Sequence, residues 1–475
     1  MIVQIAVALL ITGLIGLATW RKVASARVAH DGSGKDVFLA GGGLSWLYIA
    51  GSITLTNLST EQLVGMNGNQ MLLLAWWELA GFVGLLILAG VFVPIYYRNQ
   101  CTTVTELLER RYRGSSVRTL VSAIFLVGTV LIYVPAALYS GSLFLKTMLG
   151  WQGSLLVFAV PMAVIAALYT ILGGLRAVAV MDTYAGIGVL AIALLVVVLA
   201  MNTIGWSFEG VPAERLTMVG DPDSPIPFHT LFTGMLFIQI FYWSTNQNIT
   251  QKAMTAPTVR EAQRGVLAAA VVRILIIPVI VVVPGVVAWK LFGPLGDASY
   301  GRIVAHVLPA WLSGTFAALM AAAVIAHTAA ILNGAVALYA IDFHERFVAR
   351  ITDHWRISLR ATIVIAVVGV VIVPLFESAK SIINLLQQLN GLTSMPILSA
   401  FVVGLLFKGV RAAAASLAIG FGVAFYGWLS FAPPAFLPSW FHYIDAMLVT
   451  LLACIAVALL ANRLMGSEPQ TGAAA

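Results

Sequence analysis

Charged residues are scarce in this chain, and their scarcity excludes the ordinary water-soluble classes of protein. Only 9% of the 475 residues are Asp, Glu, Lys or Arg, whereas 60% are hydrophobic and the mean hydropathy is +0.97. A chain of this composition suits a lipid bilayer that it crosses many times. We therefore expect an all-α polytopic membrane protein.

Cysteine is also scarce, and the common catalytic motifs are missing. Cys101 and Cys454 have no His or Cys neighbour at metal-ligand spacing, so they predict neither a disulfide framework nor a zinc site. The chain has no HExxH motif, no phosphate-binding loop and no clustered acidic motif. We therefore expect neither an enzyme nor a tightly bound cofactor.

Long apolar segments, in contrast, are abundant, and we expect each to cross a hydrocarbon core of about 30 Å as a helix. About thirteen such helices are predicted, at residues 2–20, 44–66, 71–97, 118–146, 153–173, 178–203, 227–250, 262–292, 312–341, 358–376, 379–405, 411–431 and 439–464. The first is followed at once by Arg21 and Lys22, which favours a retained helix over a cleaved signal peptide.

The net charge of +7 is explained by membrane topology, without a nucleic-acid partner. Of the 26 Lys and Arg residues, 20 fall in alternate loops, five fall in the other loops, and Arg273 lies inside a predicted helix. Lys- and Arg-rich loops stay on the cytoplasmic side. We expect a multi-pass protein of the inner (plasma) membrane with its N-terminus outside and its C-terminus in the cytoplasm.

Polar residues interrupt two of the predicted helices, 44–66 and 227–250. The first interruption holds Thr56, Asn57, Ser59, Thr60, Glu61 and Gln62; the second holds Gln239, Ser244, Thr245, Asn246 and Gln247. A polar break at membrane depth persists only where protein buries it or where it lines a path for solute. The breaks open two five-helix blocks, 44–203 and 227–405, flanked by the peripheral segments 1–43 and 406–475. Such a pair of blocks is typical of inverted-repeat transporters.

Glu78 is a carboxylate inside a predicted helix with Trp76 and Trp77 beside it. A carboxylate accepts hydrogen bonds from sugar hydroxyls, and an indole covers the apolar face of a sugar ring, so the group suits a polyol. The alternative is an ion pair with Arg273, which has apolar neighbours for several turns. Both interpretations stay open at this point.

The chain resembles the solute:sodium symporter family, which includes sodium/galactose and sialic acid transporters. The likeness rests on the segments NLSTEQLVGMNG (57–68), TVTELLERRYRG (103–114), YTILGGLRAVAVMD (169–182), YWSTNQNITQKAM (242–254), EAQRG (261–265), VVVPGVV (281–287) and ILNGAVALYAIDF (331–343). The resemblance implies a leucine-transporter-type 5+5 inverted repeat and alternating access to a central site. It also implies a small-molecule solute, a sugar or sugar acid, as the partner.

The resemblance also implies individual roles. Matching motif positions assign solute binding to Asn57, Gln62, Glu78, Gln239, Arg273 and Gln387, with Tyr242 as the inner gate and Met66 as part of the outer lid. Gln239 stands where the sugar transporters usually have Asn, and Arg273 stands where they usually have Lys. The planar fork of an arginine also suits a carboxylate, so a sugar acid is the alternative solute.

The cation site departs from the family pattern. The resemblance implies that Na⁺ lies between backbone carbonyls near Leu55 and Leu58 and two serine hydroxyls, which become Ala326 and His327 here. No serine lies between residues 313 and 358, and the remaining groups are the Thr328 hydroxyl and the Asp182 carboxylate of a second site.

Tight coupling to Na⁺ is therefore doubtful, and three modes stay open. They are protonation of His327, since an unperturbed imidazole has a pKa near 6.5, transport without coupling, and Na⁺ held by Thr328 and backbone carbonyls. A membrane sensor that kept a transporter fold is the alternative of another class. We favour a transporter because no kinase-like or PAS-like domain follows residue 465.

Overall fold

The computed structural model describes residues 45–56, 58–101, 104–348 and 354–466, and residues 6, 7, 10 and 13 before them. All regular elements in these ranges are helices. Nine helices of the described ranges are long and apolar enough to cross a membrane: Leu72–Arg98, Ser116–Leu149, Ala185–Thr203, Val259–Phe292, Ala310–Leu338, Trp355–Phe376, Ile382–Leu406, Ala412–Phe431 and Tyr443–Met465. The all-α membrane architecture is confirmed. The count of thirteen is not, and almost all of the predicted helix 2–20 lies outside the described residues.

In the first half of the chain, the helix of the first polar interruption is divided in two. The elements are α3 (Trp46–Thr56), α4 (Thr60–Gly68), η3 (Leu72–Ala75), α5 (Trp76–Leu79), α6 (Gly81–Ile87), η4 (Leu88–Phe92), α7 (Val93–Arg98), α8 (Val104–Tyr112), α9 (Ser115–Gly128), η5 (Thr129–Tyr133), α10 (Val134–Leu149), α11 (Leu156–Leu168), η6 (Tyr169–Gly173) and α12 (Gly174–Thr203). The Ser59 hydroxyl caps α4 by accepting a hydrogen bond from the backbone N–H of Gln62 at 3.4 Å. The predicted interruption is confirmed.

The second half repeats this division at the second polar interruption. Its elements are α13 (Ala213–Leu216), η7 (Phe228–Phe232), α14 (Gly234–Thr245), α15 (Gln247–Ala253), α16 (Val259–Leu275), α17 (Ile277–Phe292), η8 (Gly296–Ala298), α18 (Ser299–Val307), α19 (Ala310–Leu338), η9 (Tyr339–Val348), α20 (His354–Phe376), α21 (Ile382–Leu406), α22 (Ala412–Phe431) and α23 (Tyr443–Met465). Asn246, between α14 and α15, is extended. Near this break the Tyr96 hydroxyl donates to the Ser244 carbonyl at 2.9 Å, which satisfies a backbone acceptor at the helix end.

One predicted helix boundary is corrected by the structure, and another predicted helix contains a break. The predicted helix 227–250 begins as α14 only at Gly234, after the short turn η7. The predicted helix 262–292 corresponds to the apolar span Val259–Phe292, which is interrupted at Ile276 between α16 and α17, because Pro278 in the first turn of α17 has no N–H to continue the ladder. The break matters because Arg273 lies in the last turn of α16.

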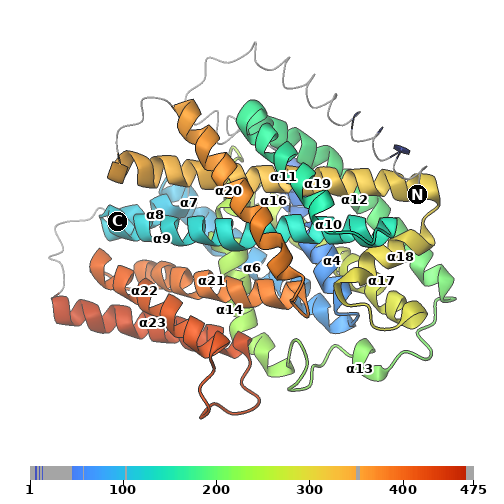
Figure 1. Cartoon of the computed structure of the whole chain (residues 1–475). Coiled ribbons are helices and arrows are strands. Elements are labelled where there is room, and N and C mark those ends of the chain that lie inside the picture. Colours follow the sequence, from blue (N-terminus) through green and yellow to red (C-terminus); the bar gives the residue numbers. More distant parts are fainter. Residues whose placement is uncertain are drawn as a thin grey trace.

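The helices pack into one bundle, with α21, α22 and α23 side by side along one flank (Figure 1). Small residues allow the close approach of these three helices. A Cβ on Gly422 of α22 would lie 2.9 Å from the Pro396 side chain of α21, so a larger residue would force the two helices apart.

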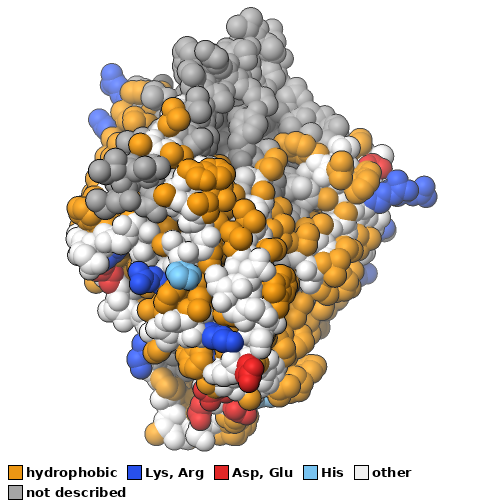
Figure 2. All heavy atoms as spheres, turned by 90° about the vertical axis from the view of Figure 1, so that its right-hand side faces the viewer, with side chains coloured by type: hydrophobic (Ala, Val, Ile, Leu, Met, Phe, Trp, Pro, Cys, Tyr) orange, Lys and Arg blue, Asp and Glu red, His pale blue; other side chains and the backbone are white. Residues whose placement is uncertain are grey.

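Hydrophobic side chains cover a broad, continuous area of the surface, and the charged side chains are few and scattered on the face that Figure 2 shows. On α20 the exposed side chains Val364, Val367, Val371 and Leu375 follow one helical stripe. Exposure of such an apolar stripe to water is unfavourable, whereas its contact with lipid acyl chains is favourable. The surface therefore agrees with the long apolar helices in indicating a bilayer around the bundle.

Candidate functional site

Glu78 of α5 and Arg273 of α16 form a buried ion pair in which the Arg273 guanidinium donates to Glu78 Oε2. Each side chain is 1% exposed. An isolated charge at this depth would be strongly unfavourable, so each group neutralises the other. The alternative that the sequence left open for Glu78, an ion pair with Arg273, is what the structure contains.

Gln62 extends this pair from α4, the helix that follows the first break. Its Nε2 donates to the second carboxylate oxygen of Glu78, Oε1, at 2.8 Å. Gln62 is at the third position of α4, where the Ser59 cap holds the helix start. The first break thus places the side-chain amide of Gln62 against the carboxylate of Glu78.

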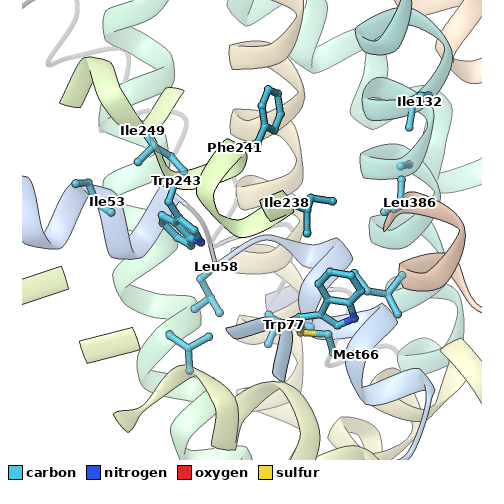
Figure 3. Close-up of a cluster of buried hydrophobic side chains, with 14 of the residues drawn as sticks. Ile53, Leu58, Met66, Trp77, Ile132, Ile238, Phe241, Trp243, Ile249 and Leu386 are labelled. Atoms are coloured by element: carbon cyan, nitrogen blue, oxygen red, sulfur yellow. The ribbon is translucent and has the colours of Figure 1, made fainter. Parts of the chain in front are cut away.

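Trp243 also contacts the guanidinium group of Arg273. The guanidinium carbon of Arg273 lies 4.4 Å from the centroid of the Trp243 ring, which is a cation–π contact. The Trp243 Nε1 donates to Gln239 Oε1 at 3.0 Å, and the Gln239 Nε2 donates to the Trp77 carbonyl at 2.6 Å. Figure 3 shows Trp243 of α14 and Trp77 of α5, with Leu58 near Trp243 and Met66 beside Trp77.

The structure therefore joins four of the predicted solute-binding residues into one network, which we term the Glu78 cluster: Gln62, Glu78, Gln239 and Arg273, with Trp243 between the last two. Gln239 is 5% exposed and both ends of its amide bond to protein groups. Its geometry is that of a residue that positions Trp243.

Gln387 belongs to a second polar group on α21. Its Oε1 accepts from Asn390 Nδ2 at 3.0 Å, and Asn390 Oδ1 accepts from the Tyr133 hydroxyl of η5 at 2.8 Å. Helix α14, which carries Gln239, contacts both α21 and α6.

The predicted gate residues lie on the broken helices themselves. Met66 of α4 is 1% exposed. Tyr242 of α14 is half-buried and packs edge-to-face on Trp243, with ring centroids 5.4 Å apart. Asn57, the sixth predicted solute-binding residue, lies outside the described residues.

The predicted cation region brings α4 and α19 together. His327 Nε2 lies 3.6 Å from Glu61 Oε1, which is beyond hydrogen-bond length but close enough for an ion pair when the imidazole is protonated. The hydroxyl of Thr328 is buried and has no hydrogen-bond partner among the described residues. Ala326 and Leu58 are buried too, at 1% and 6% exposure. The side chains of Leu55 and Asp182 lie outside those that the structure describes.

This region offers few oxygen ligands to a hard cation. In the described part of the chain, no group of three or more His, Cys, Asp or Glu side chains lies close enough to hold a metal ion. Ala326 contributes a methyl group and His327 an imidazole, so in the described part of the chain the nearby side-chain oxygens are those of Thr328, Glu61 and Thr170, whose hydroxyl donates to the Ala329 carbonyl at 3.1 Å. Such hard cations prefer oxygen ligands in larger number.

Sequence reasoning missed the roles of Trp243, Asn390 and Glu61. Trp243 directly follows the predicted gate Tyr242, and Asn390 lies three residues after Gln387, which places Asn390 and Gln387 on one helix face. Glu61 is adjacent to Gln62 but points to His327. Its contact could be found only by packing α4 against α19, because the two residues are far apart in the chain.

Comparison with known proteins gives consistent matches over most of the chain. Residues 37–422 match the sodium:solute symporter family. The chain is 33% identical over 440 residues to the uncharacterized symporter YidK of Escherichia coli strain K12, with 87% of this chain and 76% of that protein covered. It is 27% identical to the sodium/glucose cotransporter of Vibrio parahaemolyticus, over 94% of this chain and 87% of the relative.

Among solved structures, a Na⁺-coupled sialic acid symporter in its substrate-bound outward-open state superposes with a TM-score of 0.77. The match covers 98% of this chain and 99% of that one at 16% sequence identity. It shows that the two proteins share a fold.

Proposed function

Because this chain belongs to the sodium:solute symporter family, we propose that it is a secondary transporter that carries an uncharged monosaccharide or polyol through the membrane by alternating access. The observation that carries this proposal is the Glu78 cluster, in which a carboxylate, a guanidinium and two amides converge beside indole rings. Such groups can exchange their mutual hydrogen bonds for bonds to sugar hydroxyls.

The charges of the cluster favour a neutral solute over a sugar acid. Arg273 is compensated by Glu78, and both are buried. A carboxylate ligand on Arg273 would leave two negative groups around one positive group in a site of low dielectric constant, which is costly. A neutral polyol leaves the pair electrically balanced.

We further propose that residues 44–203 and 227–405 are the two inverted repeats and that 1–43 and 406–475 are peripheral. The broken helices α3/α4 and α14/α15 would then open the two repeats at corresponding places, as in transporters with a midplane site. The loop 204–226 would face the outside of the cell and the Lys- and Arg-rich loops the cytoplasm.

For the coupling ion, we propose that Na⁺ is not tightly coupled to transport. The support is the side chains of Ala326 and His327, which offer no oxygen, and the approach of His327 to Glu61. Protonated His327 beside Glu61 would provide a positive charge where the family carries Na⁺. Uncoupled transport is the second candidate, favoured by the half-buried state of His327 without a hydrogen bond to Glu61.

Ligand-induced thermal stabilisation of the purified protein tests the solute class. We expect a neutral monosaccharide or polyol to raise the melting temperature, because a ligand that binds only the folded state stabilises it. Glu78→Gln should remove the shift, whereas the matched variant Glu61→Gln should keep it. Stabilisation by sugar acids alone would contradict the neutral-solute proposal, and the absence of any shift across a broad panel would contradict solute binding.

Counterflow in proteoliposomes separates a transporter from a sensor with the same fold. Vesicles loaded with the unlabelled stabilising sugar should accumulate the labelled sugar transiently, because a carrier exchanges the two. Binding without counterflow would indicate the sensor.

A further inference from the structure

Three segments meet at the end of the bundle that carries the loop 204–226, here termed the 204–226 face. They are the C-terminal end of α4, the turn η8 and the N-terminal end of α21, and α4 contacts the other two. Arg215 of the loop donates to the Gln70 carbonyl just after α4, at 3.2 Å. In this structure the three segments close the 204–226 face.

Glycines on α4 make this closure tight. A Cβ on Gly68 would lie 2.8 Å from the Cα of Asp297 in η8, and a Cβ on Gly65 would lie 2.9 Å from the Cβ of Ile383 in α21. Carbon atoms cannot approach to these distances without displacement. At Gly68 the backbone of α4 therefore packs directly on the backbone of η8, and any other residue there would separate η8 from α4.

Side-chain hydrogen bonds join the same segments. Asn69 Nδ2 donates to the Ser381 hydroxyl, which begins α21, at 3.0 Å. The Gln70 amide donates to the Gly293 carbonyl and accepts from the Leu295 N–H, both at 3.0 Å, so it holds the chain that leads into η8. If the three segments separate, all of these hydrogen bonds break.

Asp297 is the acidic residue at the centre of this junction. It is 9% exposed, and its Oδ2 accepts from the Ile382 N–H at the start of α21, at 2.9 Å. Its Oδ1 is buried and has no hydrogen-bond partner within the described ranges. A buried carboxylate with one oxygen unpartnered is unfavourable, whereas a carboxylic acid in the same place is uncharged.

We propose that Asp297 is a proton-binding site and that the bound proton stabilises the closed 204–226 face. Burial raises the pKa of Asp297 to about 7, and the Ile382 N–H opposes this only in part. Once the segments separate, water reaches the carboxyl group and its pKa returns to the ordinary value of about 4.

The direction of the pH effect follows from these two values. Because the pKa is higher in the closed state, the closed state binds the proton more tightly. The stabilisation is complete below about pH 4 and is lost as the pH rises through about 7. Between pH 5 and pH 8 the ratio of closed to open protein should fall by up to about 100-fold.

Other titratable and charged groups lie on the helices α10 and α18, which contact η8, and in the segment before α21, but the Ile382 N–H bonds to Asp297. They are Lys146 and Tyr139 of α10, Tyr300, Arg302 and His306 of α18, and Glu377 and Lys380 before α21. Phenols titrate near pH 10, outside this range. His306 is exposed and packs on Phe292, so it serves as the matched histidine control.

A reporter cysteine at Ile383 tests the proposal on the full-length protein, because Ile383 is 5% exposed and packs on Gly65. Both native cysteines are buried and should label slowly. Maleimide labelling of Ile383→Cys is compared with that of Ile383→Cys/Asp297→Asn at pH 5 and pH 8. Because both proteins carry the same thiol, their ratio at each pH removes the effect of thiol ionisation. The amide of the Asp297→Asn variant keeps an acceptor for the Ile382 N–H but carries no charge.

We expect the two proteins to label equally at pH 5, and the protein that keeps Asp297 to label at least tenfold faster at pH 8. Ile383→Cys/Gly68→Ala should label fast at both pH values, because the added methyl group holds η8 away from α4. An unchanged ratio between pH 5 and pH 8, or loss of the pH response in Ile383→Cys/His306→Gln, would overturn the proposal. The measurement needs no solute, so its failure leaves the proposed transport function untouched.

Discussion

Adjacent residues of α4 belong to two regions that differ in how their polar atoms are partnered. Gln62 points to the Glu78 cluster, where carboxylate, guanidinium, amides and indole N–H bond to one another. Glu61 points to the cation region, where His327 is 3.6 Å away and the Thr328 hydroxyl has no hydrogen-bond partner in the described part of the chain. One helix start therefore serves a network in which both charges are paired, although Gln62 Oε1 has no hydrogen-bond partner among the described residues, and a loosely connected region.

The difference predicts which of the two regions is more sensitive to substitution. A buried network in which each charge is paired depends strongly on every member, because removal of one member leaves another unpaired. A region with methyl groups and one imidazole in place of hydroxyls depends little on its members. Substitutions should therefore have large effects in the Glu78 cluster and small effects in the cation region.

The largest effect is expected from removing one partner of the buried ion pair. Arg273→Met should destabilise the protein by about 3–5 kcal/mol, because it leaves the Glu78 carboxylate buried without a counter-charge. Thermal unfolding in detergent measures the loss. The double variant Arg273→Met/Glu78→Gln should recover much of it, and a double variant less stable than Arg273→Met would contradict the ion-pair explanation.

A smaller effect is expected for Gln62→Leu, and it should be a loss of affinity for the solute. The substitution removes the amide that donates to Glu78 Oε1. A hydrogen bond to a charged group contributes about 1.5–3 kcal/mol. The affinity for the stabilising solute should fall about 10-fold to 100-fold, as measured by titration of the thermal shift. Unchanged affinity would remove Gln62 from the site.

Trp243→Phe should have a moderate effect, because a phenyl ring still faces Arg273 but has no N–H for Gln239. We expect about 1 kcal/mol of lost stability, the contribution of one neutral hydrogen bond. Gln239→Leu removes the same bond from the other side, so a double-mutant cycle should show coupling between the two changes. Additive effects would argue against Gln239 as the residue that positions Trp243.

The smallest effect is expected for Glu61→Gln, the same substitution as Glu78→Gln but in the cation region. A partly exposed contact of this length contributes no more than about 1 kcal/mol. The melting temperature should therefore stay close to that of the native protein, while Glu78→Gln lowers it clearly. Similar losses in both variants would contradict the contrast between the two regions.

Much of the fold follows from the sequence, because segments that cross lipid form helices. Polar residues that interrupt such apolar segments are easy to recognise. Glu78 and Arg273 stand out for this reason, and so do the breaks after Thr56 and before Gln247. Their partners were harder to predict. Whether Glu78 meets a sugar or Arg273, and whether Glu61 reaches His327, depends on how α4 packs against α5, α16 and α19, and local sequence does not report such contacts.

Uptake of the stabilising sugar into proteoliposomes under an imposed inward Na⁺ gradient tests the central claim most directly. Parallel vesicles with K⁺ in place of Na⁺ provide the control. If the solute half is intact and the Na⁺ half is lost, the sugar should equilibrate to the same level in both. Steep accumulation that requires Na⁺ and collapses with a sodium ionophore would contradict the account.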